Sequence, residues 1–288
     1  MTEITASQVK ELRDKTGLGM MDCKRALQES NGDIQEAITN LRKSSALKAE
    51  KKASRTAVEG VILVNLDETK KNALMVEVNC ETDFVAKDKN FLSFCDSVIS
   101  YSTDLAEEKD PLEKLQSYME EPKQALIQKI GENIKIRKLE LLKGSTVEIY
   151  LHGNKKIGVS VSIEGGDEEL AKDLAMHIAA SSPLVVNPED LNEEILQKER
   201  EIITSQVKTE NKPAEIQEKM IEGRINKYLS EVSLVKQSFV KDPNQTIQSL
   251  LNENNSKVIS FVRLEVGEGI EVEEKDFASE VMSQIEEN

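Results

Sequence analysis

Apolar residues in the first 55 positions recur at helical spacing and are interrupted by glycine turns. Val9 and Leu12 mark one face of a helix that stops at the turn TGLG, and a second helix, MMDCKRALQES, follows this turn. A third helix, IQEAITNLRK, begins after an N-cap at Asp33. The polar and basic run SSALKAEKKASR, residues 44–55, predicts a solvated helical extension or a linker. We therefore expect a three-helix module at the start of the chain.

The rest of the chain shows one order of elements twice: two strands, a helix, more helix and a strand. The first copy comprises strands over residues 58–67 and 71–79, helical segments over 90–101 and 111–131, and a strand over 132–142. The second comprises strands over 146–152 and 157–165, helices over 167–181 and 243–253, and a strand over 256–266. This repetition predicts an α+β fold with two duplicated α/β core subdomains, built on antiparallel sheets and packed side by side.

The two copies differ in the connection between the second strand and the helix. It has four residues in the second copy, EGGD, and ten in the first, CETDFVAKDK, from Cys80 to Lys89. Because the fold can close with the short form, the longer loop predicts a binding role. It carries Phe84, in a chain with six Phe, four Tyr and no Trp. The ring either folds back onto its own core or anchors a partner, and both interpretations stay open.

A second insertion is expected between residues 188 and 230. Its apolar residues fall at helical spacing on either side of a break at Pro213; they are Leu191, Ile195, Ile202, Ile216, Met220, Ile225 and Leu229. The narrow stripe and charged flanks predict a helical hairpin, an antiparallel coiled-coil arm, with ordinary core helices as the alternative. A last helix, EKDFASEVMSQIEEN, is expected to close the chain.

Composition favours a soluble chain long enough for two or three domains, with 38% hydrophobic and 32% charged residues. The start of the sequence has no apolar targeting segment and no window resembles a membrane span, so we expect a cytoplasmic protein without a membrane partner. Three separated cysteines and two histidines argue against a disulfide framework, a metal site or a metal cofactor.

The net charge of −15 is unevenly distributed. Residues 1–55 carry 11 Lys or Arg and 8 Asp or Glu, a net of +3, which leaves −18 for the rest of the chain. A body this acidic repels phosphates, so direct binding of nucleic acid is disfavoured.

Sequence motifs of catalysis are missing as well. The chain has no phosphate-binding loop, no dinucleotide fingerprint, no nucleophile elbow and no zinc-protease helix. His152, at a hairpin turn, is read as a surface or capping residue because no base or orienting partner accompanies it. Met20 and Met21 are divided: we expect one to pack in the helical core and the other to form an adaptable exposed contact. The sequence predicts a protein that is not an enzyme.

Five stretches, in this order along the whole chain, resemble the bacterial elongation factor Ts family: VKELRDKTGLGMMDCKRALQESNGD, NCETDFVAKD, YLHGNKKIGVSV, EKMIEGRINKY and FVRLEVGEGIE. The resemblance implies a guanine nucleotide exchange factor that releases GDP from elongation factor Tu and needs no cofactor. It also implies an N-terminal ubiquitin-associated (UBA-like) module with a basic linker over 1–55, core subdomains over 56–143 and 144–267, the arm in the second, and a C-terminal helical module over 268–288. A one-to-one complex, a homodimer and a two-to-two complex all stay open, as does an adaptor role without exchange activity.

The resemblance also implies the site residues. The loop matched by Thr82, Asp83, Phe84 and Val85 would dislocate Mg²⁺ in elongation factor Tu, with Phe84 as the wedge. The other implied contacts to elongation factor Tu are Arg13, Met20, Met21, Lys24, Ile130, Gly131, His152 and Gly153. Two small departures from the family pattern, Leu18 between the turn glycines and the extra basic residue of GNKK, bear on these contacts only.

Overall fold

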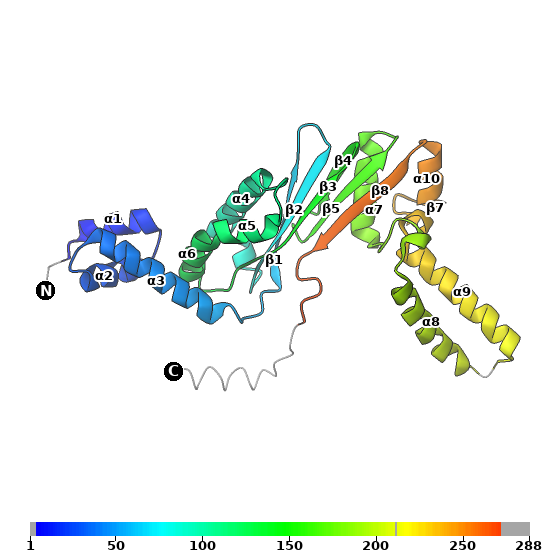
Figure 1. Cartoon of the computed structure of the whole chain (residues 1–288), viewed down its shortest axis with the longest axis horizontal. Coiled ribbons are helices and arrows are strands. Elements are labelled where there is room, and N and C mark those ends of the chain that lie inside the picture. Colours follow the sequence, from blue (N-terminus) through cyan, green and yellow to red (C-terminus); the bar gives the residue numbers. More distant parts are fainter. Residues whose placement is uncertain (1–3, 211, 272–288) are drawn as a thin grey trace.

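Helices flank two stacked antiparallel sheets in this computed structural model, which describes residues 4–210 and 212–271 (Figure 1). The elements in chain order are α1 (Ala6–Thr16), α2 (Met20–Glu29), α3 (Ile34–Lys52), β1 (Glu59–Leu66), β2 (Asn72–Cys80), the 3-10 helix η1 (Val85–Lys87), α4 (Lys89–Asp104), α5 (Pro111–Tyr118), α6 (Glu120–Ile130), β3 (Lys135–Lys143), β4 (Thr146–Leu151), β5 (Ile157–Glu164), α7 (Glu168–Ser181), η2 (Pro188–Asp190), α8 (Glu193–Lys208), α9 (Ala214–Val232), η3 (Leu234–Lys236), β6 (Ser238–Phe239), β7 (Asp242–Thr246), α10 (Ile247–Glu253) and β8 (Lys257–Glu265).

The two three-stranded sheets share one topology. The strand orders are β1-β2-β3 and β4-β5-β8, and all neighbours are antiparallel. The central strand of each sheet carries a register shift near its end, after Glu77 in β2 and after Ser162 in β5. The repeated order of elements and the α+β class are therefore confirmed.

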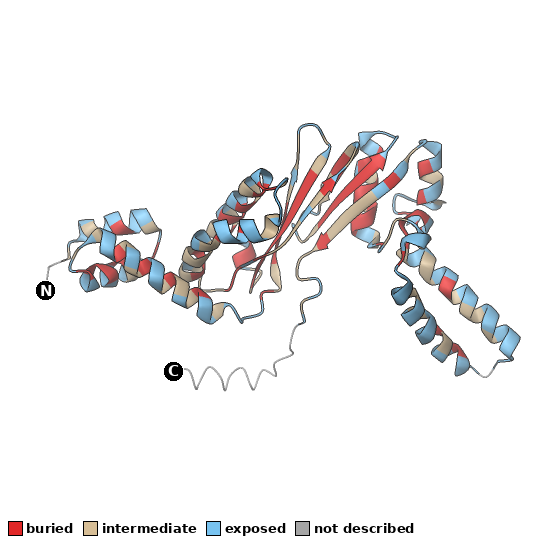
Figure 2. Ribbon diagram, viewed as in Figure 1, coloured by how far each residue is buried: buried red, intermediate tan, exposed pale blue. Residues whose placement is uncertain are grey.

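The two sheets stack face to face. The sequence predicted only that the two copies pack side by side, without saying which surfaces meet. Ile62 and Met75 of the first sheet meet Leu264 of the second in one buried cluster. A Cβ added at Gly158 of β5 would lie 2.6 Å from Ile62 Cγ2, so glycine permits the close approach. Since helices cover the outer faces, β2 is buried from Ala73 to Cys80 (Figure 2).

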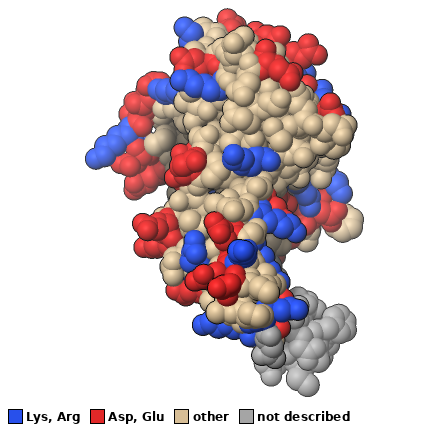
Figure 3. All heavy atoms as spheres, turned by 90° about the vertical axis from the view of Figure 1, so that its right-hand side faces the viewer, with Lys and Arg blue, Asp and Glu red and all other residues tan. Residues whose placement is uncertain are grey.

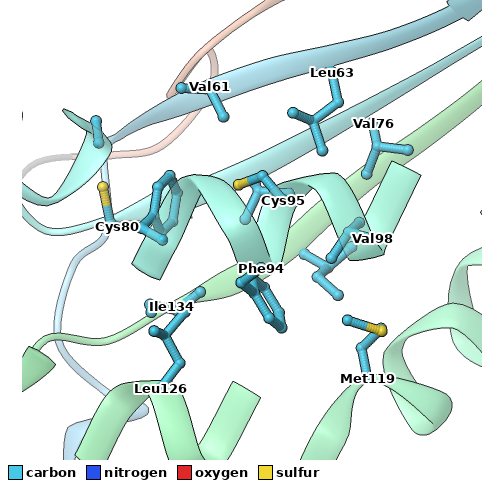
Figure 4. Packing of buried hydrophobic residues seen from close by; sticks show 14 of the residues in the cluster. Val61, Leu63, Val76, Cys80, Phe94, Cys95, Val98, Met119, Leu126 and Ile134 are labelled. Atoms are coloured by element: carbon cyan, nitrogen blue, oxygen red, sulfur yellow. The ribbon is translucent and has the colours of Figure 1, made fainter. Parts of the chain in front are cut away.

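Each outer face has its own hydrophobic core. In the first copy α4, α5 and α6 cover the sheet. Figure 4 shows Cys95 of α4 on the side of the strands, near Val61, and Phe94 on the opposite side of the helix, toward Met119 and Leu126. In the second copy α7 and α10 pack on the sheet through Leu174, Ile178 and Leu251. None of the helices in residues 4–210 and 212–271 combines the length and the apolar content that a bilayer crossing requires.

The N-terminal helices close on a small core that includes Leu12, Cys23 and Leu27. The predicted N-cap at Asp33 is confirmed, because its carboxylate accepts hydrogen bonds from the first amides of α3. The expectation of a solvated extension over residues 44–55 is wrong for one helix face. Helix α3 continues unbroken to Lys52, and it packs against α6 with Ser45 and Ala49 buried.

Helices α8 and α9 form a hairpin around Ile203, Val207 and Ile225. The stripe expected from the sequence is partly wrong: Ile195, Ile202 and Ile216 are exposed. Where two apolar residues are adjacent, as Ile202 and Ile203 are, helical spacing is compatible with either residue on the buried face. The prediction placed Ile202 there, whereas Ile203 is the buried one.

The expected helix over residues 243–253 is too long at its start. Residues Asp242–Thr246 form β7, which pairs with β6, and Thr246 caps a helix that begins at Ile247. A Thr hydroxyl that accepts an amide hydrogen bond favours a helix start at the next residue. The expected C-terminal helix, from Glu274 to Asn288, lies outside the described residues.

Candidate functional site

The loop after β2 is fixed at its base by a carboxylate from a distant segment. Glu132, which follows α6, accepts a hydrogen bond from Thr82 Oγ1 at 2.7 Å. Its second oxygen accepts from the backbone amides of Glu81 at 3.1 Å and Thr82 at 3.0 Å. Three donors within two residues therefore hold the loop where it leaves the sheet.

The other end of the loop is fixed by local structure. The amide of Ala86 donates to Thr82 O at 3.2 Å, and Asp88 caps α4. Val85 and Ala86 are buried beneath the turn, whereas the Phe84 ring is 82% exposed. Of the four loop residues expected in the site, Phe84 alone projects an apolar group into solvent. Thr82 and Val85 anchor the loop.

Asp83 is exposed enough to meet a partner but already has an intramolecular one. Lys87 Nζ lies 2.8 Å from Asp83 Oδ2. This hydrogen bond is the main reason that the pKa of Asp83 lies below the usual value of 3.8, and the charge of Lys156 contributes in the same direction. Two consecutive residues of the loop therefore present a carboxylate and an aromatic ring to solvent.

The hairpin turn between β4 and β5 lies near this loop. Its Lys156 forms an ion pair with Glu59 at the start of β1, and its Lys155 O accepts a hydrogen bond from Ile62 N at 2.7 Å. His152 and Gly153 are exposed on this turn, and His152 Nδ1 lies 2.9 Å from Asn154 Oδ1. The surface reading of His152 is confirmed.

Ile130 and Gly131 lie next to the anchor of the loop. Gly131 ends α6 with a φ of 91°, a left-handed conformation suited to glycine, and its carbonyl accepts a hydrogen bond from Lys52. Asn133 then donates to Arg55 O at 2.7 Å. The segment after α6 thus joins the end of α3 to the base of the loop.

The remaining expected residues lie in the N-terminal module, apart from the loop. Arg13, Met20, Met21 and Lys24 are all exposed on α1 and α2, which Figure 1 places at one end of the molecule beyond α6. The expectation that one of the two methionines packs in the core is wrong, since Met20 is 60% and Met21 is 75% exposed. Leu18 is buried in their place.

On the face of the molecule shown in Figure 3, charge does not single out a further site. The face turned to the viewer in Figure 3 carries acidic and basic side chains in interspersed groups, with uncharged surface between them. Among residues 4–210 and 212–271, no three His, Cys, Asp or Glu side chains are grouped as a metal ion would require. Sequence reasoning missed Glu132 and Lys87, and the only available signal for Glu132 was its position directly after Ile130 and Gly131.

Comparison with known proteins agrees with the motifs in this site. The sequence profile described as Elongation factor TS matches residues 81–268. The chain is 51% identical over 285 residues to an elongation factor Ts of Hahella chejuensis, covering 99% of both chains. It is 53% identical over 285 residues to that of Teredinibacter turnerae, covering 98% of this chain and 97% of the relative. For Photorhabdus laumondii the identity is 52% over 281 residues, with 98% of each chain covered. The chain therefore belongs to the elongation factor Ts family of translation elongation factors.

Proposed function

We propose that the chain is the guanine nucleotide exchange factor of elongation factor Tu and that the Phe84 loop loosens bound GDP. The observation that carries the proposal is the Phe84 ring, 82% exposed on a loop whose two ends are fixed by hydrogen bonds. Aromatic anchors supply much of the energy of protein interfaces, and a loop already ordered loses little freedom on binding. Family membership supports the same role.

The mechanism requires no bond chemistry from this chain. A factor that weakens GDP binding must itself bind more weakly when GDP is present, because the coupling of the two sites is reciprocal. By resemblance to the family, Phe84 enters between two helices of the GTPase domain, and Asp83 forms a polar contact beside it. Mg²⁺ bridges the nucleotide phosphates and the GTPase, so a shift of those helices breaks its coordination and weakens GDP binding.

The other expected residues would bind elongation factor Tu without displacing its helices. His152 and Gly153, on the turn near the loop, and Ile130 and Gly131, beside its anchor, would extend the contact. The N-terminal module, taken with the family as UBA-like, would dock separately through Arg13, Met20, Met21 and Lys24. Burial of a Phe side chain contributes about 1.5–3 kcal/mol, so the wedge accounts for roughly ten- to 150-fold in exchange.

The experiment measures release of fluorescent GDP from elongation factor Tu after addition of excess unlabelled GDP. Phe84→Ala is expected to slow the maximal stimulated rate at least about tenfold while circular dichroism stays unchanged. Tyr118→Ala is the matched control, since it truncates an exposed aromatic outside the loop. Unchanged release with Phe84→Ala would contradict the wedge. Binding of the wild-type chain without faster release would favour an adaptor.

A further inference from the structure

We propose that Glu132 is a positioning residue for Phe84, an inference that rests on the function proposed above. Glu132 makes its contacts through a half-buried carboxylate that faces the loop base. Its role would be to set the direction in which the loop leaves β2 and hence the direction of the ring.

The carboxylate replaces backbone pairing where the sheet ends. The ladder between β2 and β3 stops at the pair Asn79–Lys135. Beyond it, Glu132 accepts the amides of Glu81 and Thr82, and Glu81 Oε1 in turn accepts the amide of Asn133 at 2.6 Å. Without these acceptors, partly buried amides would lose their partners, which costs about 1–3 kcal/mol each.

The second copy closes the corresponding corner differently. Its ladder between β5 and β8 ends at the pair Glu164–Lys257, and Gly165 follows. A Cβ at Gly165 would lie 2.4 Å from Asn255 O, so there the two backbones touch directly. In the first copy a carboxylate spans this corner and leaves space for a longer loop. The bridge is therefore specific to the copy that carries Phe84.

Thr82 transmits the position of Glu132 to the ring. Its hydroxyl donates to Glu132 and accepts from the amide of Val85 at 3.4 Å, while its carbonyl accepts from Ala86 at 3.2 Å. Phe84 lies within this turn, so a shift at Thr82 moves the ring. Misplacement by about 1 Å is enough to lose much of the effect of a positioned group.

The test compares stimulated GDP release by Glu132→Ala, Glu132→Gln, Phe84→Ala and the double variant Glu132→Ala/Phe84→Ala. Glu132→Ala is expected to lower the maximal rate about tenfold, and Glu132→Gln less, because an amide oxygen still accepts hydrogen bonds. In the Phe84→Ala background, Glu132→Ala should change the rate less than about twofold, since both act through one ring. Asn133→Ala is the control: it breaks the side-chain hydrogen bonds from the same segment to Ala53 O and Arg55 O, just after α3, but leaves Glu132 in place.

The outcomes separate this inference from the proposed function. If Phe84→Ala slows release and Glu132→Ala does not, Glu132 has no positioning role and the proposed function stands. The inference is also overturned if Glu132→Ala slows release equally in the wild-type and Phe84→Ala backgrounds. The same holds if Asn133→Ala slows release as much as Glu132→Ala does. If neither Phe84→Ala nor Glu132→Ala slows release, both proposals fail. Should Glu132→Ala not fold, Thr82→Val removes the same hydroxyl contact and is expected to show the same dependence on Phe84.

Discussion

The Nζ atom of Lys87 lies 2.8 Å from Oδ2 of Asp83, so an ion pair spans the turn that contains Phe84. The Lys87 side chain is exposed and that of Asp83 is half-exposed, and such pairs contribute little to folding stability. Their relevance is to binding. Any cation of a partner that meets Asp83, next in sequence to the exposed Phe84, must compete with Lys87.

Replacement of Lys87 should change the titration of Asp83. The pKa of Asp83 lies below 3.8 mainly because Lys87 donates a hydrogen bond to the ionised form. The ion pair therefore persists as the pH falls to 3.8, and it is lost only when the pH falls further, through the lowered pKa of Asp83. In Lys87→Met the pKa of Asp83 should rise toward 3.8, measured by carboxyl carbon NMR. Lys89→Met, which changes a nearby exposed lysine, is the control and should leave the pKa of Asp83 unchanged. The same pKa of Asp83 in the wild type and in both variants would contradict the pairing.

Two phenylalanines in neighbouring segments should differ sharply in their contribution to folding. Phe84 is 82% exposed and Phe91 is fully buried. In urea denaturation we expect Phe84→Ala to change the free energy of unfolding by less than about 0.5 kcal/mol, and Phe91→Ala to lower it by about 3–5 kcal/mol. A large loss for Phe84→Ala would mean that the ring packs on its own subdomain in solution.

The sequence predicted the positions of helices and strands better than the burial and the long-range contacts of their side chains. Caps and turn glycines located the N-terminal helices because these signals act within a few residues, as at Asp33. The length of the loop after β2 also identified Phe84. Its exposure could not be settled, since the pattern does not show whether Val85 or the ring fills the core. Glu132 lies far from Thr82 in sequence, so no local pattern connects them.

Tertiary packing explains the wrong expectations. Met20 and Met21 both point outward because Leu18 fills the core that one of them was expected to enter. On α3, Ser45 and Ala49 are small enough for α6 to approach, which a count of polar residues does not reveal. Glu77 alternates with valines in β2, and its side chain is completely buried.

Removal of the Glu77 carboxylate should destabilise the fold strongly. Its Oε1 accepts hydrogen bonds from Arg137 Nη1 at 2.6 Å, Asn79 Nδ2 at 3.0 Å and the amide of Gly267 at 2.8 Å. Glu77→Ala leaves a guanidinium, a side-chain amide and a backbone amide without this acceptor, and breaking a buried pair costs about 3–5 kcal/mol. Glu77→Gln keeps an acceptor oxygen and should cost less. Chemical denaturation measures both, and equal losses would show that the site depends on side-chain volume alone.

His177 should make stability depend on pH in the mildly acidic range. Val240 N donates to its Nδ1 at 3.3 Å, so Nε2 carries the proton and donates to Gln237 Oε1 at 2.9 Å. Burial lowers the pKa of His177 below 6.5, against a smaller opposing effect of Gln237. The unfolded chain then binds more protons than the folded one below pH 6.5, so stability falls as the pH decreases through this value, by at most about 1.4 kcal/mol per pH unit. His177→Gln removes the titration, and its free energy of unfolding should fall less between about pH 7.5 and about pH 5.5 than that of the wild type. Parallel losses in both proteins would assign the pH dependence to other groups.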